Sequence, residues 1–154
     1  MKKEIIIGNH VISEDSPAFI IAEMSANHNM DFDRAVAIMQ AAKDAGADAV
    51  KIQTYTADTI TLDCDDPCFQ ITQGTLWDGT TLQTAYTPWE WQPKLKQIAE
   101  DMGLEFFSSP FDLTAVDFLE EMDVSAYKIA SFEINDIPMI KKIAKLFLLI
   151  LLGS

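Results

Sequence analysis

Four short apolar runs with polar residues at their ends set the pattern of this chain. They are FIIAE at 19–23, AVKIQT at 49–54, FFSSP at 106–110 and YKIAS at 127–131. Such runs, rich in β-branched and aromatic residues, are typical of buried strands. Three segments with apolar residues at helical spacing separate them. This alternation predicts an α/β fold in which successive β/α units build one parallel sheet.

The same pattern sets the expected bounds of the elements. The expected strands are 19–22, 47–55, 105–108 and 126–131, and residues 4–12 predict a small hairpin with its turn at Gly8-Asn9. Helices are expected from a cap at Asp31 or Asp33 to Gly46, at 89–102, from Asp112 to Glu121, and from Asn135 or Asp136 to about Lys145. The irregular segment 56–88 is expected to be a functional loop.

The end of the sequence departs from this regular pattern. Residues 146–152 read LFLLILL, an apolar run without alternation. A transmembrane helix needs about 20 apolar residues, so the run predicts a strand of a buried sheet instead. We therefore expect the chain to stop inside a fold. The alternative is a natural half-barrel, or a dimer that covers the tail.

Composition and charge narrow the class of protein. The chain has 154 residues, enough for one domain, and its net charge is −13. This acidic balance argues against binding to nucleic acid or to anionic membranes, although a few converging lysines could still hold an anion. The amino terminus turns polar after the apolar residues 5–7, too early for a secretory signal, so a cytoplasmic location is expected. Cys64 and Cys68 are interpreted as reduced thiols in a loop.

The polar residues of the four runs suggest an enzyme. Glu23 ends the first run, Lys51 lies within the second, and serines follow in the third and fourth. In parallel β/α folds the carboxyl ends of neighbouring strands meet on one face, where ligands bind. A carboxylate or an ammonium in an apolar strand is costly unless it is paired or functional. An internal ion pair of Lys51 or Lys128 with Glu23 or Glu133 is the structural alternative.

Six segments together resemble the amino-terminal half of the sialic acid synthase family. They are IIAEMSANHN (20–29), DAGADAVKIQTY (44–55), GTLWDG (74–79), AYTPWEW (85–91), FFSSPFD (106–112) and AYKIASFE (126–133). Within this family, GTLWDG and AYTPWEW most resemble the segments of pseudaminic acid synthases. The resemblance implies a partial (β/α)8 TIM barrel, of which residues 1–154 carry about the first four β/α units. The carboxyl-terminal half of the barrel and an antifreeze-like domain are expected to be absent.

The resemblance also implies a reaction. Family members are homodimers that condense phosphoenolpyruvate with an N-acylated amino sugar, release phosphate and use a divalent metal (Mn or Mg). Glu23 matches the glutamate that faces the reacting centre, and Lys51, Ser109, Lys128 and Ser131 match positions that bind phosphoenolpyruvate. Gln53 and Glu133 match sugar-contacting positions. Ser108 is a less certain neighbour, Asn27 and His28 are interpreted as loop-bracing residues, and Asp112 as a helix cap.

The sequence differs from the family pattern in two places. The loop before Trp89 is short, with only TTLQT at 80–84, and the metal-binding histidines of the family have no counterpart in this chain. We therefore expect an inactive fragment of a pseudaminic acid synthase, with an N-acetylneuraminate or legionaminate synthase as the alternative. Two other hypotheses are a non-catalytic half-barrel that self-associates, and an aldolase that uses Lys51 or Lys128 as a Schiff-base amine.

Overall fold

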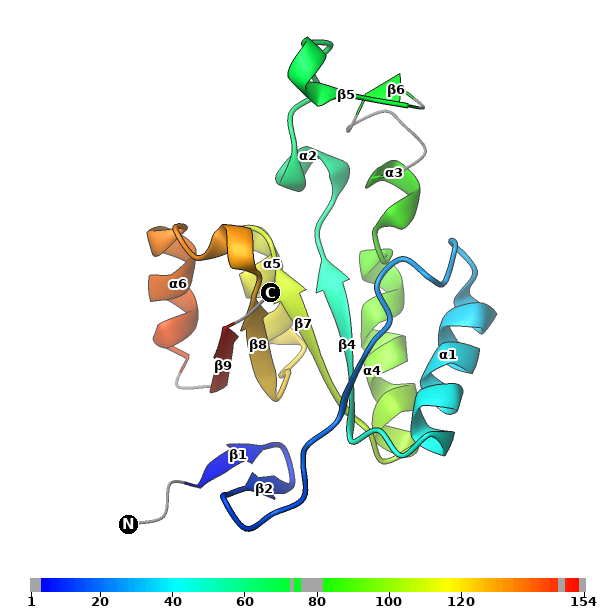
Figure 1. The fold of residues 1–154 in the computed structure, drawn as a ribbon, viewed down its shortest axis with the longest axis vertical. Coiled ribbons are helices and arrows are strands. Elements are labelled where there is room, and N and C mark those ends of the chain that lie inside the picture. The colour runs from blue at the N-terminus through cyan, green and yellow to red at the C-terminus, as the bar shows by residue number, and fades with distance from the viewer. Residues whose placement is uncertain (1–3, 73, 76–81, 147–148, 153–154) are drawn as a thin grey trace.

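A five-stranded parallel sheet forms the centre of the computed structural model, which describes residues 4–72, 74–75, 82–146 and 149–152. The strand order is β3 (Ile21–Glu23), β4 (Ala49–Thr54), β7 (Glu105–Pro110), β8 (Ala126–Ile129) and β9 (Leu149–Leu152). Helices α1 (Phe32–Asp44), α4 (Gln92–Asp101), α5 (Leu113–Glu121) and α6 (Ile137–Ala144) connect these strands and lie along the outside of the sheet (Figure 1). The expected partial barrel of about four β/α units is confirmed.

The helices begin and end where side chains satisfy the backbone. The carboxylate of Asp31 accepts a hydrogen bond from the amide of Arg34 at 3.0 Å, and Asp136 caps α6 by accepting one from Met139 at 3.0 Å. Asp112 caps α5, as predicted. Gly46 follows α1 in a left-handed conformation with φ +86°, which glycine adopts without a steric penalty. Local capping therefore defines the helices, and their apolar faces then pack on the sheet.

Several bounds differ from those predicted. Glu23 is the last residue of its strand rather than the residue after it, and β7 continues to Pro110. β8 stops at Ile129, so that Ser131 opens a short 3-10 turn, η3 (Ser131–Glu133). Trp89 begins another such turn, η2 (Trp89–Trp91), and α4 starts only at Gln92, because Pro93 fits the first turn of a helix.

Residues 56–88 contain short elements instead of one structureless loop. These are α2 (Ala57–Ile60), η1 (Pro67–Phe69), β5 (Gln70–Ile71), β6 (Gly74–Thr75) and α3 (Leu82–Ala85). Cys64 lies before η1 and Cys68 within it, and both are free, as expected. Part of the GTLWDG motif, residues 76–79, lies outside the described residues.

The tail 146–152 supplies β9, which pairs in parallel with β8. Residues 147–148 of this tail also lie outside the described residues.

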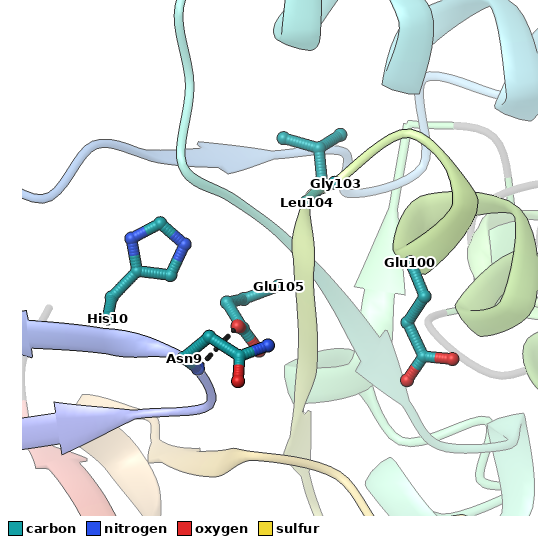
Figure 2. A pocket seen from close by; sticks show the side chains of 6 residues that line it. All are labelled: Asn9, His10, Glu100, Gly103, Leu104 and Glu105. Atoms are coloured by element: carbon teal, nitrogen blue, oxygen red, sulfur yellow. Dashed lines mark hydrogen bonds between the residues drawn. The ribbon is translucent and has the colours of Figure 1, made fainter.

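The predicted hairpin closes the amino-terminal end of the sheet. β1 (Ile5–Ile7) and β2 (His10–Ile12) pair antiparallel and lie below the amino ends of the parallel strands (Figure 1). The backbone amide of Asn9 donates a hydrogen bond to Glu105 Oε1 at 3.0 Å. This contact borders a cavity of about 300 Å³, shown in Figure 2 and lined by Asn9, His10, Glu100, Gly103, Leu104 and Glu105.

Candidate functional site at the carboxyl ends of the strands

Strand register decides which predicted residues share a face of the sheet. Neighbouring residues in register point to the same side, and successive residues alternate between the two sides. Glu23 is in register with Lys51, and Lys51 with Phe107. Gln53 is in register with Ser109 on the same two strands, β4 and β7. These four polar residues therefore share one face.

Lys128 of β8 joins the same face. Tyr127 is in register with Ser108, so the residues that follow them, Lys128 and Ser109, point together to the opposite side. The face that carries Ser108 is the helix side, because Ser108 Oγ lies 2.7 Å from Thr54 Oγ1 and Thr54 donates to Gln92 of α4 at 2.9 Å. The predicted site residues on the strands therefore share the interior face of the half-barrel, whereas Ser108 faces the helices.

Glu23 and Lys51 form an ion pair across the β3–β4 ladder. The two partners differ in exposure, with the Lys51 side chain 9% exposed and the Glu23 side chain 42% exposed. Burial, together with a smaller repulsion by Lys128, lowers the pKa of Lys51 to about 8. The two lysines are therefore close enough to act together on an anion, which would relieve their mutual repulsion.

Ser109 adds a hydrogen-bond donor beside this pair. Its side chain is 1% exposed, and its Oγ is buried without a partner among the described residues. A buried hydroxyl that lacks a partner carries a desolvation cost, which a bound ligand would offset. Two ammonium groups, one hydroxyl and one carboxylate on a single face make a site suited to a small anion.

Glu133 and Ser131 lie just beyond β8, in the turn η3. Burial raises the pKa of Glu133 to about 7 even though Lys128 acts in the opposite direction. Its Oε2 atom is buried without a partner among the residues that the structure describes. Ser131 is exposed and joins the group only through its position at the same end of the sheet. The structure thus places Glu133 near Lys128 and leaves Ser131 at the rim.

The comparisons with known proteins agree with this architecture. The NeuB family model matches residues 38–154. The pseudaminic acid synthases of Campylobacter jejuni and Helicobacter pylori are 48% and 46% identical to the chain, and each match covers 90% of it. A crystal structure of the N-acetylneuraminic acid (sialic acid) synthetase from Leptospira borgpetersenii superimposes with a TM-score of 0.81 at 30% identity, covering 99% of this chain and 50% of that one.

The chain belongs to the NeuB family. This is the sialic acid synthase family that the six sequence motifs indicate. The chain spans about two fifths of the curated relatives that it matches, 41% of the Campylobacter protein and 42% of the Helicobacter protein. The chain therefore corresponds to part of a NeuB family barrel.

Loop residues of this NeuB family chain also have defined roles. The side-chain amide of Asn27 donates to the carbonyl of Met24 at 2.9 Å, which braces the loop after β3. Asp112 accepts hydrogen bonds from the amides of Thr114 and Ala115 at 2.7 and 3.2 Å. The interpretations of Asn27 as a bracing residue and of Asp112 as a cap therefore agree with these contacts.

One buried polar group on the helix side, Gln92, was not predicted from the sequence. Gln92 is fully buried and donates to the carbonyl of Thr87 at 3.0 Å while it accepts from Thr54. A signal for Gln92 was present, because it shares a helical face with the buried residues Leu95 and Ala99 at spacings of three and four. A polar residue on a buried helical face requires internal partners. Thr87 had no comparable signal.

The divalent metal that the family resemblance implies does not fit the part of the chain described here. Its His, Cys, Asp and Glu side chains form no group of three or more that could hold an ion. The cavity in Figure 2 is lined by His10, Glu100 and Glu105, among others, and Glu105 is the first residue of β7, whereas Glu23 is the last residue of β3. Within the same ranges, no helix is long and apolar enough to cross a membrane.

Proposed function

We propose that this chain forms the phosphoenolpyruvate-binding half of the active site of a pseudaminic acid synthase. The observation that carries the proposal is the shared interior face of Glu23, Lys51, Ser109 and Lys128, which come from four neighbouring strands. Phosphoenolpyruvate carries a phosphate and a carboxylate, and two adjacent ammonium groups with a hydroxyl donor suit these two anionic groups. The identity of 46–48% to two pseudaminic acid synthases favours this branch of the family.

The proposed reaction is an aldol-type condensation. C3 of phosphoenolpyruvate attacks the aldehyde carbon of the open-chain amino sugar, and the aldehyde oxygen takes a proton to become a hydroxyl. Water then adds at C2, and the resulting intermediate loses inorganic phosphate to leave a keto group. Positive charge develops at C2 before water adds, and the Glu23 carboxylate is the group that would stabilise it.

Each remaining predicted residue has a task in this proposal. Lys51, Lys128 and Ser109 hold the phosphate and carboxylate, and Ser131 adds a hydroxyl from the rim. Gln53 and Glu133 contact the amino sugar, and Glu133 is suited to donate a proton because burial raises its pKa to about 7. The metal ligands, the rest of the barrel and the antifreeze-like domain would come from outside this chain. We therefore expect this chain by itself to bind phosphoenolpyruvate without completing the condensation.

Titration calorimetry with phosphoenolpyruvate tests the proposal. Lys51→Met and Lys128→Met should each weaken binding at least about tenfold, because each removes one charge-assisted contact. Lys145→Met is the matched control, since it removes the same charge from an exposed residue at the end of α6. Equal binding by all four proteins, or no binding by the unsubstituted chain, would contradict the proposal. Metal-dependent condensation by the chain alone would contradict the expectation that this chain does not complete the reaction.

The sugar assignment has its own test. N-acetylneuraminate and legionaminate synthases are the alternatives within the family, and they would share the phosphoenolpyruvate contacts. A protein that continues this chain through the second half of the barrel should release phosphate fastest with the amino sugar precursor of pseudaminic acid. Faster release with the precursor of another nonulosonic acid would move the assignment to that branch.

Exposed apolar residues at the sheet edges support a second candidate, a half-barrel that self-associates. In the described part of the chain, β3 and β9 each pair with one strand only. Ile20 and Ile21 at one edge are 51% and 36% exposed, and Leu152 at the other is 63% exposed. Open parallel edges with apolar side chains favour association. A clean monomer in sedimentation velocity would count against this candidate.

A further inference from the structure

The loop between β3 and α1 holds an unusual backbone conformation directly after Glu23. Ser25, Asn29 and Met30 have φ angles of 49°, 50° and 57°. Left-handed conformations are uncommon for residues other than glycine, and they persist only where the surroundings hold them. Because Glu23 is the last residue of β3, its direction depends on how this loop leaves the strand. The contacts that hold the loop therefore bear on the proposed active site.

His28 supplies two of these contacts. Its Nδ1 atom accepts a hydrogen bond from the amide of Met30 at 3.1 Å, and its Nε2 atom lies 3.3 Å from Thr87 Oγ1. An Nδ1 acceptor in a neutral imidazole places the proton on Nε2, which therefore donates to Thr87. The ring is fully buried, and its edge packs on Trp91 at a centroid distance of 5.8 Å. His28 thus connects the loop after β3 to the segment before α4.

The connection continues to the strands that carry the site. The carbonyl of Thr87 accepts from Gln92, and Gln92 accepts from Thr54 at the end of β4. Thr54 in turn is bonded to Ser108 of β7. All five side chains in this chain of hydrogen bonds are at most 1% exposed; they are His28, Thr87, Gln92, Thr54 and Ser108. Buried polar networks of this kind fix one arrangement, because each broken bond leaves a desolvated group.

We propose that His28 is a positioning residue that holds the loop after β3 against Thr87 and thereby keeps the Glu23 carboxylate on Lys51. The proposal deepens the proposed function, because it names what orients the carboxylate assigned to the reacting centre. Met24, the residue after Glu23, extends the ladder by donating from its amide to the carbonyl of Lys51 at 3.0 Å. The loop turns away from the strand at the next residue, Ser25.

The titration of the Lys51 amine reports the position of Glu23. Nuclear magnetic resonance of the isotope-labelled lysine side chains follows this titration in the intact chain. Glu23→Gln gives the reference, and should lower the pKa of Lys51 because it removes the counter-charge. Thr87→Val should lower this pKa by at least half of the reference shift, and Thr87→Ser, which keeps the hydroxyl, should restore it. Ile143→Val, in the buried face of α6 and away from the loop, is the control for general destabilisation.

The result that would overturn the proposal is a Lys51 titration that is the same in Thr87→Val and Ile143→Val. His28→Gln is the second variant if Thr87→Val does not fold. It keeps a donor near Thr87 but loses the acceptor for Met30, and it should also shift the titration. An unchanged pKa of Lys51 in a folded His28→Gln protein would overturn the proposal as well.

Calorimetry with phosphoenolpyruvate on the same samples tests the proposed function separately. A chain that shows the shift but binds no phosphoenolpyruvate would support the positioning role and reject the proposed function.

Discussion

Glu23 and Lys51 are register partners on adjacent parallel strands, and their side chains form an ion pair in the interior of the half-barrel. The pair is asymmetric, because the ammonium is almost fully buried while the carboxylate is partly exposed. Removal of the carboxylate therefore leaves a buried charge, whereas removal of the lysine leaves a carboxylate that water can reach. This asymmetry makes the pair suited to a thermodynamic test.

Glu23→Gln should lower the free energy of unfolding by about 1–2 kcal/mol, less than for a fully buried pair because Glu23 is partly exposed. The double variant Glu23→Gln, Lys51→Met should recover most of this loss, since it removes the buried charge as well. Urea unfolding of the four proteins in a double-mutant cycle gives the coupling. A coupling of zero would mean that the two side chains do not interact in solution.

Glu133 should make stability depend on pH. Its pKa is raised to about 7 in the folded chain, so the folded state binds more protons than the unfolded state between about 4.5 and 7. Its contribution to stability therefore falls as the pH rises through this window. Glu133→Gln should remove the dependence and gain about 1 kcal/mol at pH 8 relative to pH 5, a figure reduced for partial exposure. Urea unfolding at both pH values measures the free energy of unfolding of each protein. The same change in this free energy between pH 5 and pH 8 in Glu133→Gln and in the unsubstituted chain would contradict the prediction.

Gly8→Ala should destabilise the hairpin lid more than Gly46→Ala destabilises the end of α1. Both glycines have positive φ, at +52° and +86°, which costs about 1–2 kcal/mol for an L-residue. At Gly8 an added Cβ would also displace the carboxylate of Glu105, which would then lose its hydrogen bond from the Asn9 amide, whereas at Gly46 it would meet no atom within 4 Å. Thermal unfolding compares the two variants. In a Glu105→Ala background, Gly8→Ala should cost no more stability than Gly46→Ala. If the two alanine substitutions already cost the same in the chain that keeps Glu105, the Glu105 side chain moves aside freely.

Asp112→Ala should cost about 1 kcal/mol of stability, because two backbone amides at the start of α5 lose their acceptor. Asp112→Asn should cost only a few tenths of this, since asparagine caps helices nearly as well. Binding of phosphoenolpyruvate should be unchanged in both folded variants. A selective loss of binding in Asp112→Asn would assign this carboxylate to the site instead of the cap.

The local elements follow from local chemistry, which is why the sequence alone predicts them well. The backbone amides in the first turn of a helix have no partner within the helix, and three aspartates accept hydrogen bonds from them: Asp31, Asp112 and Asp136. These helix starts therefore depend on neighbouring residues and not on the rest of the fold. The strand bounds are less accurate. Ser131 lies in a 3-10 turn rather than a strand, because a strand ends where its neighbours stop pairing with it.

Periodicity and motifs are properties of neighbouring residues, so the parallel α/β order, the family and the polar strand ends at Glu23, Lys51 and Lys128 can be predicted without a structure. The folded chain was needed to show that Ser109 faces the interior and Ser108 the helices. That choice depends on the register between β4 and β7, whose paired residues lie more than fifty positions apart. The hydrogen-bond chain from Ser108 to His28 has the same origin, since its partners meet only when the strands and α4 pack together.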